Sequence, residues 1–179
     1  SEVVVERDGA QERYAASIVV VSGGAINSAA LLLRSATGAH PNGLANGSGV
    51  VGRHYMSHNN SMLIALSKEK NPTLFHKTFA MTDFYFGADD FPFPLGCIQL
   101  MGNAHAEVLG EGAPPGTPKR ILRLMASHGI PFWLTSEDLP DPENRVALTS
   151  DGGIQLRYTP NNLEGHTRLG AKVREMLVE

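Results

Sequence analysis

The feature that most constrains this chain is an unbroken apolar run followed at once by a glycine turn. Residues 18–21 read Ile-Val-Val-Val, and Ser22-Gly23-Gly24-Ala25 comes directly after them. Because the run has no polar alternation, it predicts a β-strand that is buried on both faces. Such a strand needs neighbours, and only one hairpin is predicted beside it, from residues 3–7 and 12–16 around Asp8-Gly9. We therefore expect that the other strands of its sheet are missing from this chain.

A helix is predicted after the glycine turn. Asn27 or Ser28 is a suitable N-cap, and the Ala- and Leu-rich stretch 29–33 forms the body of a helix that runs through Ser35. The unit is a strand, a turn and a helix, as found in an α/β layer. Residues 36–52 are rich in glycine and predict an irregular surface loop.

The remainder of the chain predicts an antiparallel sheet with helices. Strands are expected at residues 62–67, 82–86, 95–101 and 131–135. Residues 110–118 form a Gly/Pro break that predicts a mobile loop, and 119–127 fits either a strand or a short helix. Tyr85, Trp133 and a Phe-rich stretch can line a substrate cavity, but core packing is the default interpretation.

The C-terminal part carries a clear hairpin and an amphipathic helix. Residues 144–149 and 153–158 alternate apolar and polar side chains across Ser150-Asp151-Gly152. The pair Asn161 and Glu164 resembles a capping box. It precedes a helix whose predicted buried face holds Leu169, Val173, Met176 and Leu177.

These elements predict an α+β fold with an antiparallel sheet and helices, plus the remnant strand-turn-helix of an α/β domain. The predicted boundary lies near residue 58, so that residues 1–58 form one domain and 59–179 form the other.

Composition excludes several classes of protein. The net charge is −3 and there is no basic run, which argues against a nucleic-acid partner bound through its phosphates. The longest apolar runs, 18–21 and 29–33, are far shorter than the roughly 20 residues that span a bilayer, so no membrane segment is predicted. A single cysteine, Cys97, excludes an internal disulfide and a multi-cysteine zinc site.

The first residue is Ser, which suggests a piece cut from a longer protein. Any targeting signal would lie upstream, and the cytoplasm is the default localisation.

Two further motifs resemble binding sites but have simpler interpretations. Residues 47–52 match G-x-G-x-x-G, but Pro41-Asn42-Gly43 precedes them and no helix is predicted after them, so a glycine-rich loop is favoured over a nucleotide site. His54 and His58 are four residues apart, yet no acidic third ligand stands at a familiar spacing. We therefore predict no metal site and place both histidines at a domain edge.

The order of motifs resembles the glucose-methanol-choline (GMC) family of flavin oxidoreductases. Residues 19–35 are similar to the second signature region of that family, an apolar strand, a small-Gly-Ala turn and a Leu-rich helix that ends in Ser. Residues 40–53 are similar to its loop of the form N-x-S-G-x-V-G-R, which leads to a His at Ser57-His58. The hairpin that begins at Asn144 and the stretch 158–162 before a helix also resemble its substrate-binding domain.

The resemblance implies a parent enzyme that binds FAD and oxidises an alcohol or sugar hydroxyl by hydride transfer to the flavin. Ser22, Gly23, Gly24, Ala25 and His58 would border the cofactor. Residues from about 59 onward would form the substrate-side sheet that covers the reactive face of the flavin.

Two departures from the family pattern limit what this chain is expected to do alone. The N-terminal G-x-G-x-x-G of the family is absent, and the segment with its catalytic His would begin after Glu179. His166 has the wrong spacing for that role and is predicted to be a solvated helix residue. We thus expect no catalytic residue here, no retained FAD, no activity of the piece alone, and self-association through uncovered surfaces. The alternative is a non-enzymatic module that holds a ligand or protein on its aromatic-rich sheet.

Overall fold

The chain folds into two compact units. The structure is a computed structural model that describes residues 2–73, 75 and 77–178. The first unit comprises Ser1–Tyr55 and Asp141–Tyr158, and the second comprises Met56–Pro140 and Thr159–Glu179. The change from the first unit to the second after Tyr55 is close to the predicted boundary at 58. The hairpin after residue 140 belongs to the first unit, whereas the sequence analysis assigned it to the second. The architecture is α+β, with antiparallel sheets and helices.

The first unit consists of two hairpins and one helix. Its elements are β1 (Glu2–Arg7), β2 (Ala10–Ala15), α1 (Gly24–Arg34), β7 (Arg145–Leu148) and β8 (Ile154–Arg157). Strand β1 pairs with β2 and β7 pairs with β8, both antiparallel, as predicted. Asp8, Gly9 and Gly152 take positive φ at the two turns, which explains why these residue types occur there.

The predicted strand at residues 18–21 is wrong for this structure. None of the four residues belongs to a strand, and Ile18 and Val20 are 78% and 79% exposed. The physical reason is that a strand is defined by backbone partners, and none of the described residues pairs with this segment.

Helix α1 packs beside β7. The glycine-rich loop that follows α1 is hydrogen-bonded to the same strand. Ala30 and Val146 are buried, and the amide of Val146 donates to the carbonyl of Gly52 at 2.8 Å. Gly52 has a φ of 83°, and a Cβ there would lie 2.5 Å from the Val146 carbonyl oxygen. The predicted irregular loop over residues 36–52 is confirmed by a series of turns.

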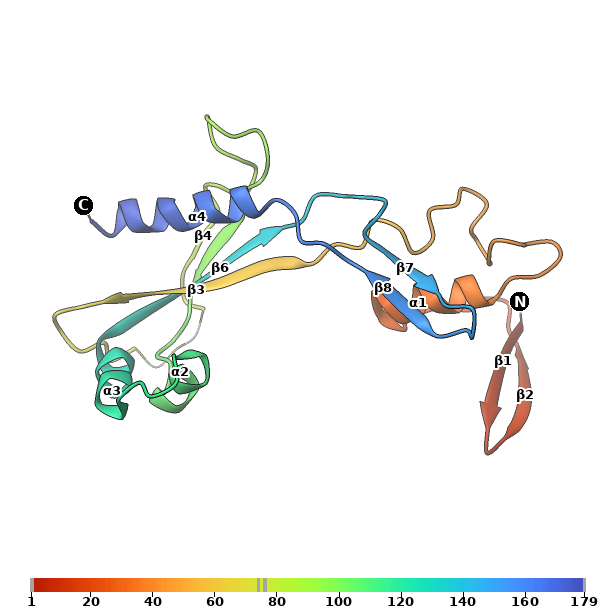
Figure 1. Cartoon of the computed structure of the whole chain (residues 1–179), viewed down its shortest axis with the longest axis horizontal. Helices are drawn as coiled ribbons and strands as arrows, with labels where there is room; N and C mark the ends of the chain where they lie inside the picture. Colours follow the sequence, from red (N-terminus) through yellow and green to blue (C-terminus); the bar gives the residue numbers. More distant parts are fainter. Residues whose placement is uncertain (1, 74, 76, 179) are drawn as a thin grey trace. The chain divides into compact units, whose positions relative to one another are not determined.

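The second unit is a four-stranded antiparallel sheet with helices on both faces (Figure 1). Its strands, in the order β3-β6-β5-β4, are β3 (His58–Leu66), β6 (Gly129–Glu137), β5 (Cys97–Leu100) and β4 (Ala80–Met81). Its helices are α2 (Ala106–Gly112), α3 (Lys119–His128) and α4 (Leu163–Met176).

Helix α4 closes the core of the second unit against one face of the sheet. The core cluster consists of fully buried aliphatic side chains from β5, β6, α4 and the residue before Gly96: Leu95, Ile98, Leu134, Leu169 and Val173. The predicted buried stripe of α4 is therefore confirmed for Leu169 and Val173. Met176 and Leu177 are exposed because they lie at the end of the helix.

Several local predictions in the second unit need correction. Residues 82–86 form a turn in which the Tyr85 amide donates to the Thr82 carbonyl at 2.9 Å, so the predicted strand there is wrong. Helix α2 occupies the start of the predicted loop at 110–118, and residues 119–127 are helical. The predicted capping box at Asn161 is also wrong, because Asn162 is the N-cap and no side chain caps the helix. The Asn161 side chain instead bonds both backbone groups of Leu139.

Candidate functional site

The predicted cofactor turn lies at the start of α1 with its backbone exposed. Gly23 is the N-cap, and Gly24 is the first helical residue with a φ of 79°. Ala25 therefore lies inside the helix, which begins before the predicted caps Asn27 and Ser28. The hydroxyl of Ser28 accepts a hydrogen bond from the amide of Gly23 at 3.0 Å.

This turn has the chemistry of an anion site. The first amides of a helix have no intrahelical partner, and the helix dipole favours negative charge near them. No side chain caps α1, and a Cβ placed on Gly24 would meet no atom within 4 Å. The backbone at Gly24 and Ala25 is thus open to a phosphate group, as a dinucleotide cofactor requires, whereas the Gly23 amide is bonded to Ser28.

His58, the fifth predicted cofactor residue, begins β3 in the second unit. Its Nδ1 lies 2.9 Å from Oε1 of Glu137, which is directly opposite on β6. Both side chains are largely exposed. His58 and the glycine turn therefore belong to different units.

The second unit has an open sheet face opposite α4. Residues directly opposite one another on antiparallel strands point to the same side, and successive rows alternate. Ile98 and Leu134 point into the core under α4, so the neighbouring rows point away from it. This open face consists of the exposed or half-buried side chains Asn60, Met62, Cys97, Gln99, Trp133 and Thr135.

The open face offers an aromatic platform beside hydrogen-bonding groups, and the His58–Glu137 pair lies on the same side in the adjacent row. None of its six side chains is acidic or basic. Thr135 Oγ1 donates to Asn60 Oδ1 at 2.9 Å, and Trp133 lies between Met62 and Gln99 in the register. Such a surface suits a neutral ligand that carries hydroxyl groups.

Helices α2 and α3 cover one end of this face. Ile64 and Pro131, which are paired in the β3–β6 register, line a narrow space together with Leu109, Met125 and Ala126. Figure 1 shows the two helices on the side of the sheet opposite α4. The helices therefore form a wall at the end of the open face.

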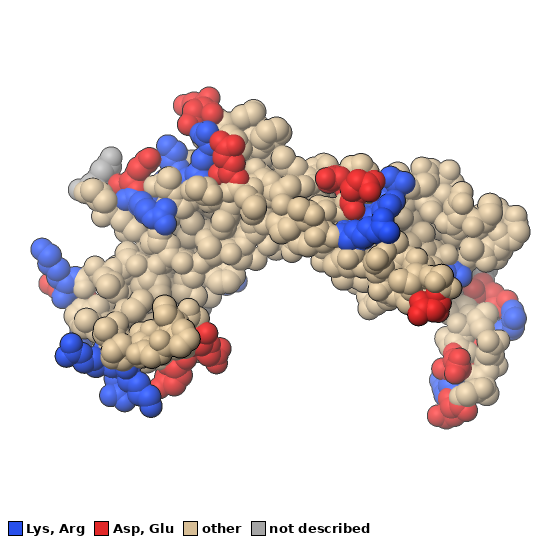
Figure 2. Space-filling model, viewed as in Figure 1, with Lys and Arg blue, Asp and Glu red and all other residues tan. Residues whose placement is uncertain are grey.

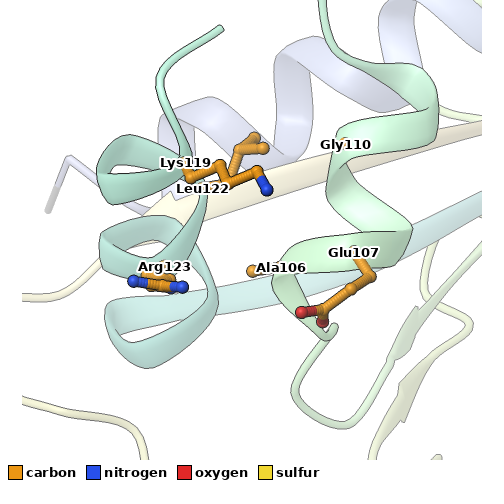
Figure 3. A pocket seen from close by; sticks show the side chains of 6 residues that line it. All are labelled: Ala106, Glu107, Gly110, Lys119, Leu122 and Arg123. Carbon is orange, nitrogen blue, oxygen red and sulfur yellow. The ribbon is translucent and has the colours of Figure 1, made fainter.

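A surface pocket of about 240 Å³ lies between α2 and α3. Lys119 and Arg123 on α3 and Glu107 on α2 line it (Figure 3). In Figure 2 the basic and acidic side chains on the face shown lie in small mixed groups. The pocket contains none of the residues that the sequence singled out.

His166 is not the solvated residue that the sequence predicted. It is half-buried between α4 and the sheet, where Nδ1 lies 2.8 Å from Ser136 Oγ and Nε2 lies 2.9 Å from Ser61 Oγ. Burial lowers the pKa of His166 below its ordinary value of 6.5. The prediction failed because it considered only the helix and not the strands β3 and β6 that lie beneath it.

A buried carboxylate that the sequence analysis did not identify organises one end of the sheet. Asp138 accepts hydrogen bonds from the Ser57 amide at 3.1 Å and from Asn59 Nδ2 at 3.1 Å. It also accepts one from the Asn161 amide at 3.0 Å. Asp138 thus holds the entry to β3 beside the segment that leads into α4. No local pattern signals this role, since its partners are distant in sequence.

The two remaining motifs do not form sites. Residues 47–52 lie in turns, and no helix follows them, so the nucleotide-binding interpretation is wrong here. His54 and His58 belong to different units, and no group of three potential metal ligands occurs in the part of the chain that the structure describes. Among the same residues, no helix combines the length and apolar character needed to traverse a bilayer.

Comparison with known proteins identifies dehydrogenase relatives. A 2-methyl-1,2-propanediol dehydrogenase from Mycolicibacterium austroafricanum is 50% identical over 158 residues, which cover 81% of this chain and 28% of the relative. The fructose dehydrogenase large subunit of Gluconobacter japonicus is 28% identical over 156 residues, which cover 80% of this chain and 28% of the relative. No protein-family model matches. The chain therefore spans less than a third of the length of these relatives, and the similarity supports an oxidoreductase without singling out one family.

Proposed function

We propose that this chain is an internal piece of a GMC-type flavin oxidoreductase whose parent oxidises an alcohol or sugar hydroxyl. The observation that carries the proposal is the match of four fifths of the chain to two proteins named as dehydrogenases, one of a diol and one of a sugar. The order of the motifs in residues 19–58 and 144–162 supports the same family.

FAD is the proposed cofactor of the parent, and the exposed turn is its proposed contact in the first unit. The amides of Gly24 and Ala25, together with the free space above Gly24, fit a phosphate-bearing cofactor. Ser22 and Gly23 precede these amides, and His58 is proposed to border the cofactor from the second unit. When bound, FAD supplies the hydride acceptor, a chemistry that no side chain provides.

The open face is the proposed substrate side of the second unit. Trp133 offers an apolar platform for the carbon skeleton, and Gln99, Asn60 and Thr135 offer hydrogen bonds to hydroxyl groups. Its six side chains carry no charge and suit a neutral alcohol or sugar, and the His58–Glu137 pair borders them in the adjacent row.

The base of the reaction is proposed to lie outside this chain. His166 belongs to α4 and contacts Ser61 on the sheet face that α4 covers, which is opposite the open face. We therefore expect the 179-residue chain alone to bind no FAD and to show no alcohol-dependent flavin reduction.

A segment exchange tests the proposal. The matching segment of the Mycolicibacterium austroafricanum dehydrogenase is replaced by this chain, and flavin content and reduction by 2-methyl-1,2-propanediol are measured. We expect the chimera to bind FAD and reduce it. Trp133→Ala in the chimera should raise KM for the diol, whereas the exposed change Lys70→Gln should not. A folded, flavin-loaded chimera without reduction by any alcohol or sugar would refute the proposal.

The alternative, a non-enzymatic binding module, relies on the same open face. It predicts that the chain alone binds a neutral polyol with an affinity that FAD and the rest of the parent do not change. Calorimetry with fructose, with and without FAD, separates the two hypotheses.

A further inference from the structure

The first unit contains a pocket of about 340 Å³ that no predicted site uses. It lies between the loop around residues 41–53 and strand β7. Leu33, near the end of α1, forms part of its wall, whereas the proposed cofactor turn is at the start of that 11-residue helix. Because a helix rises 1.5 Å per residue, the two places are about 15 Å apart. The pocket is therefore distinct from the cofactor turn.

Two arginines give this pocket a positive charge that one exposed carboxylate offsets only in part. Arg53 and Arg145 both line it. The Nε of Arg145 is buried and has no hydrogen-bond partner among the described residues. The Nη2 of Arg145 lies 3.7 Å from the exposed carboxylate of Glu143, which is beyond hydrogen-bond distance. Arg53 forms no ion pair with any residue that the structure describes.

A buried guanidinium N–H without an acceptor is unusual, since such donors in folded proteins are almost always paired. The missing partner costs free energy. Arg145 therefore lines the pocket with a hydrogen-bond donor whose capacity is unused.

The pocket is held in shape without a ligand. Asn46 Oδ1 accepts a hydrogen bond from the Val51 amide at 3.0 Å, and its Nδ2 donates to the Asn42 carbonyl at 2.7 Å. The Gly52 carbonyl accepts a hydrogen bond from the Val146 amide, which ties the loop to β7. The remaining wall is apolar and consists of Leu33, Val51, Val146 and Leu148.

We propose that this arginine pocket binds a small organic oxyanion, a carboxylate or a phosphate monoester. The charged head pairs with Arg53 and Arg145, because guanidinium groups bind both kinds of oxyanion through paired hydrogen bonds. The short body of the ligand lies against the apolar wall. The volume is in the range of pockets that hold small molecules.

Titration of the 179-residue chain with defined anions tests the proposal. Butyrate, n-butyl phosphate and inorganic phosphate are the probes, and butan-1-ol is the neutral control. Backbone amide NMR shifts of Gly49, Val51 and Val146 report on the pocket, and calorimetry gives the affinity. We expect saturable shifts with at least one of the two organic anions and none with butan-1-ol. The stronger of the two organic anions identifies the head group, and inorganic phosphate should bind more weakly than butyl phosphate.

Arginine variants locate the binding. Arg145→Gln should weaken binding about tenfold or more, because hydrogen bonds to charged groups are the strong ones. Arg145→Lys keeps the charge but loses the donor geometry, so it should also bind more weakly than the wild type. Arg53→Gln should also weaken binding. Because Arg53 is exposed, this second variant keeps the fold. Arg123→Gln removes the same charge from the pocket between α2 and α3 and should leave binding unchanged.

The proposal is overturned if neither organic anion gives saturable shifts at millimolar concentration. It is equally overturned if Arg123→Gln weakens binding as much as Arg53→Gln, since the anion would then respond to net charge alone. The inference does not depend on the proposed redox function, and a failed segment exchange would leave it standing.

Discussion

The two units use their apolar residues in opposite ways. The second unit buries Leu95, Ile98, Leu134, Leu169 and Val173 in one cluster, because α4 supplies a helix to cover the sheet. In the first unit the buried apolar residues are Ala30 and Val146, while Ile18 and Val20 are exposed. Apolar sequence therefore becomes core only where the chain supplies a surface to bury it against, and large exposed apolar segments signal a missing partner.

The largest expected effect is loss of the core of the second unit. Leu134→Ala removes a side chain that is 2% exposed and leaves a cavity between β6 and α4. We expect a loss of about 2–5 kcal/mol in the free energy of unfolding. Denaturant unfolding followed by the fluorescence of Trp133, the single tryptophan, measures it. Leu66→Ala at a 59% exposed site is the control, and an equal loss there would break the comparison between core and surface.

A close backbone contact sharpens the comparison within the second unit. Gly96 has a φ of 121°, and a Cβ there would lie 2.0 Å from the Thr135 carbonyl oxygen. Gly96→Ala should cost about 2–3 kcal/mol through clash and backbone strain. The matched control in the first unit is Gly152→Ala, where φ is 82° but the space is open, so only about 1 kcal/mol is expected. Thermal unfolding of both variants compares them.

A smaller effect concerns the pH dependence of the second unit. Burial lowers the pKa of His166 in the folded state, so the unfolded state binds more protons as the pH falls. The contribution of His166 to stability is therefore present above its unfolded pKa of about 6.5 and is lost as the pH falls through the lower folded value. His166→Gln should make the free energy of unfolding depend less on pH in that window. The control Ala171→Ser changes an exposed, non-titrating residue of the same helix and should leave the slope unchanged.

The smallest expected effect on stability is in the exposed run of the first unit. Ile18→Ser combined with Val20→Ser should change the free energy of unfolding by no more than about 0.5 kcal/mol, because neither side chain is buried. The same change should reduce self-association, which sedimentation velocity measures. A marked loss of stability would show that this run is buried in solution and would remove the contrast between the units.

Prediction from sequence succeeded where local patterns suffice. The two hairpins follow from turn residues such as Asp8-Gly9 and Gly152, which tolerate positive φ. The buried stripe of α4 follows from Leu169 and Val173 at helical spacing. The predicted strand at 82–86 failed because the Phe-rich sequence favours strands, while backbone bonds to the Thr82 and Phe84 carbonyls hold a turn there.

The candidate site could be predicted only in part. The glycine turn was identified from its place between an apolar run and a helix, yet its helix begins earlier than the predicted caps. The open face around Trp133 was not identified as a unit, because its residues come from three strands. The assignment of Ser22, Gly23, Gly24, Ala25 and His58 to a cofactor remains a prediction, as does the division into cofactor and substrate domains.

The amino-acid sequence alone determined where the hairpins turn and which stripe of α4 is apolar, since these depend on residues a few positions apart. Only the tertiary structure decided that residues 18–21 have no strand partner among the described residues, that His166 lies between Ser61 and Ser136, and that Arg53 shares a pocket with Arg145. Each of these outcomes depends on contacts between distant parts of the chain. Such contacts leave no periodicity in the sequence, because packing and hydrogen bonding depend on which residues are close in space and not on their spacing along the chain.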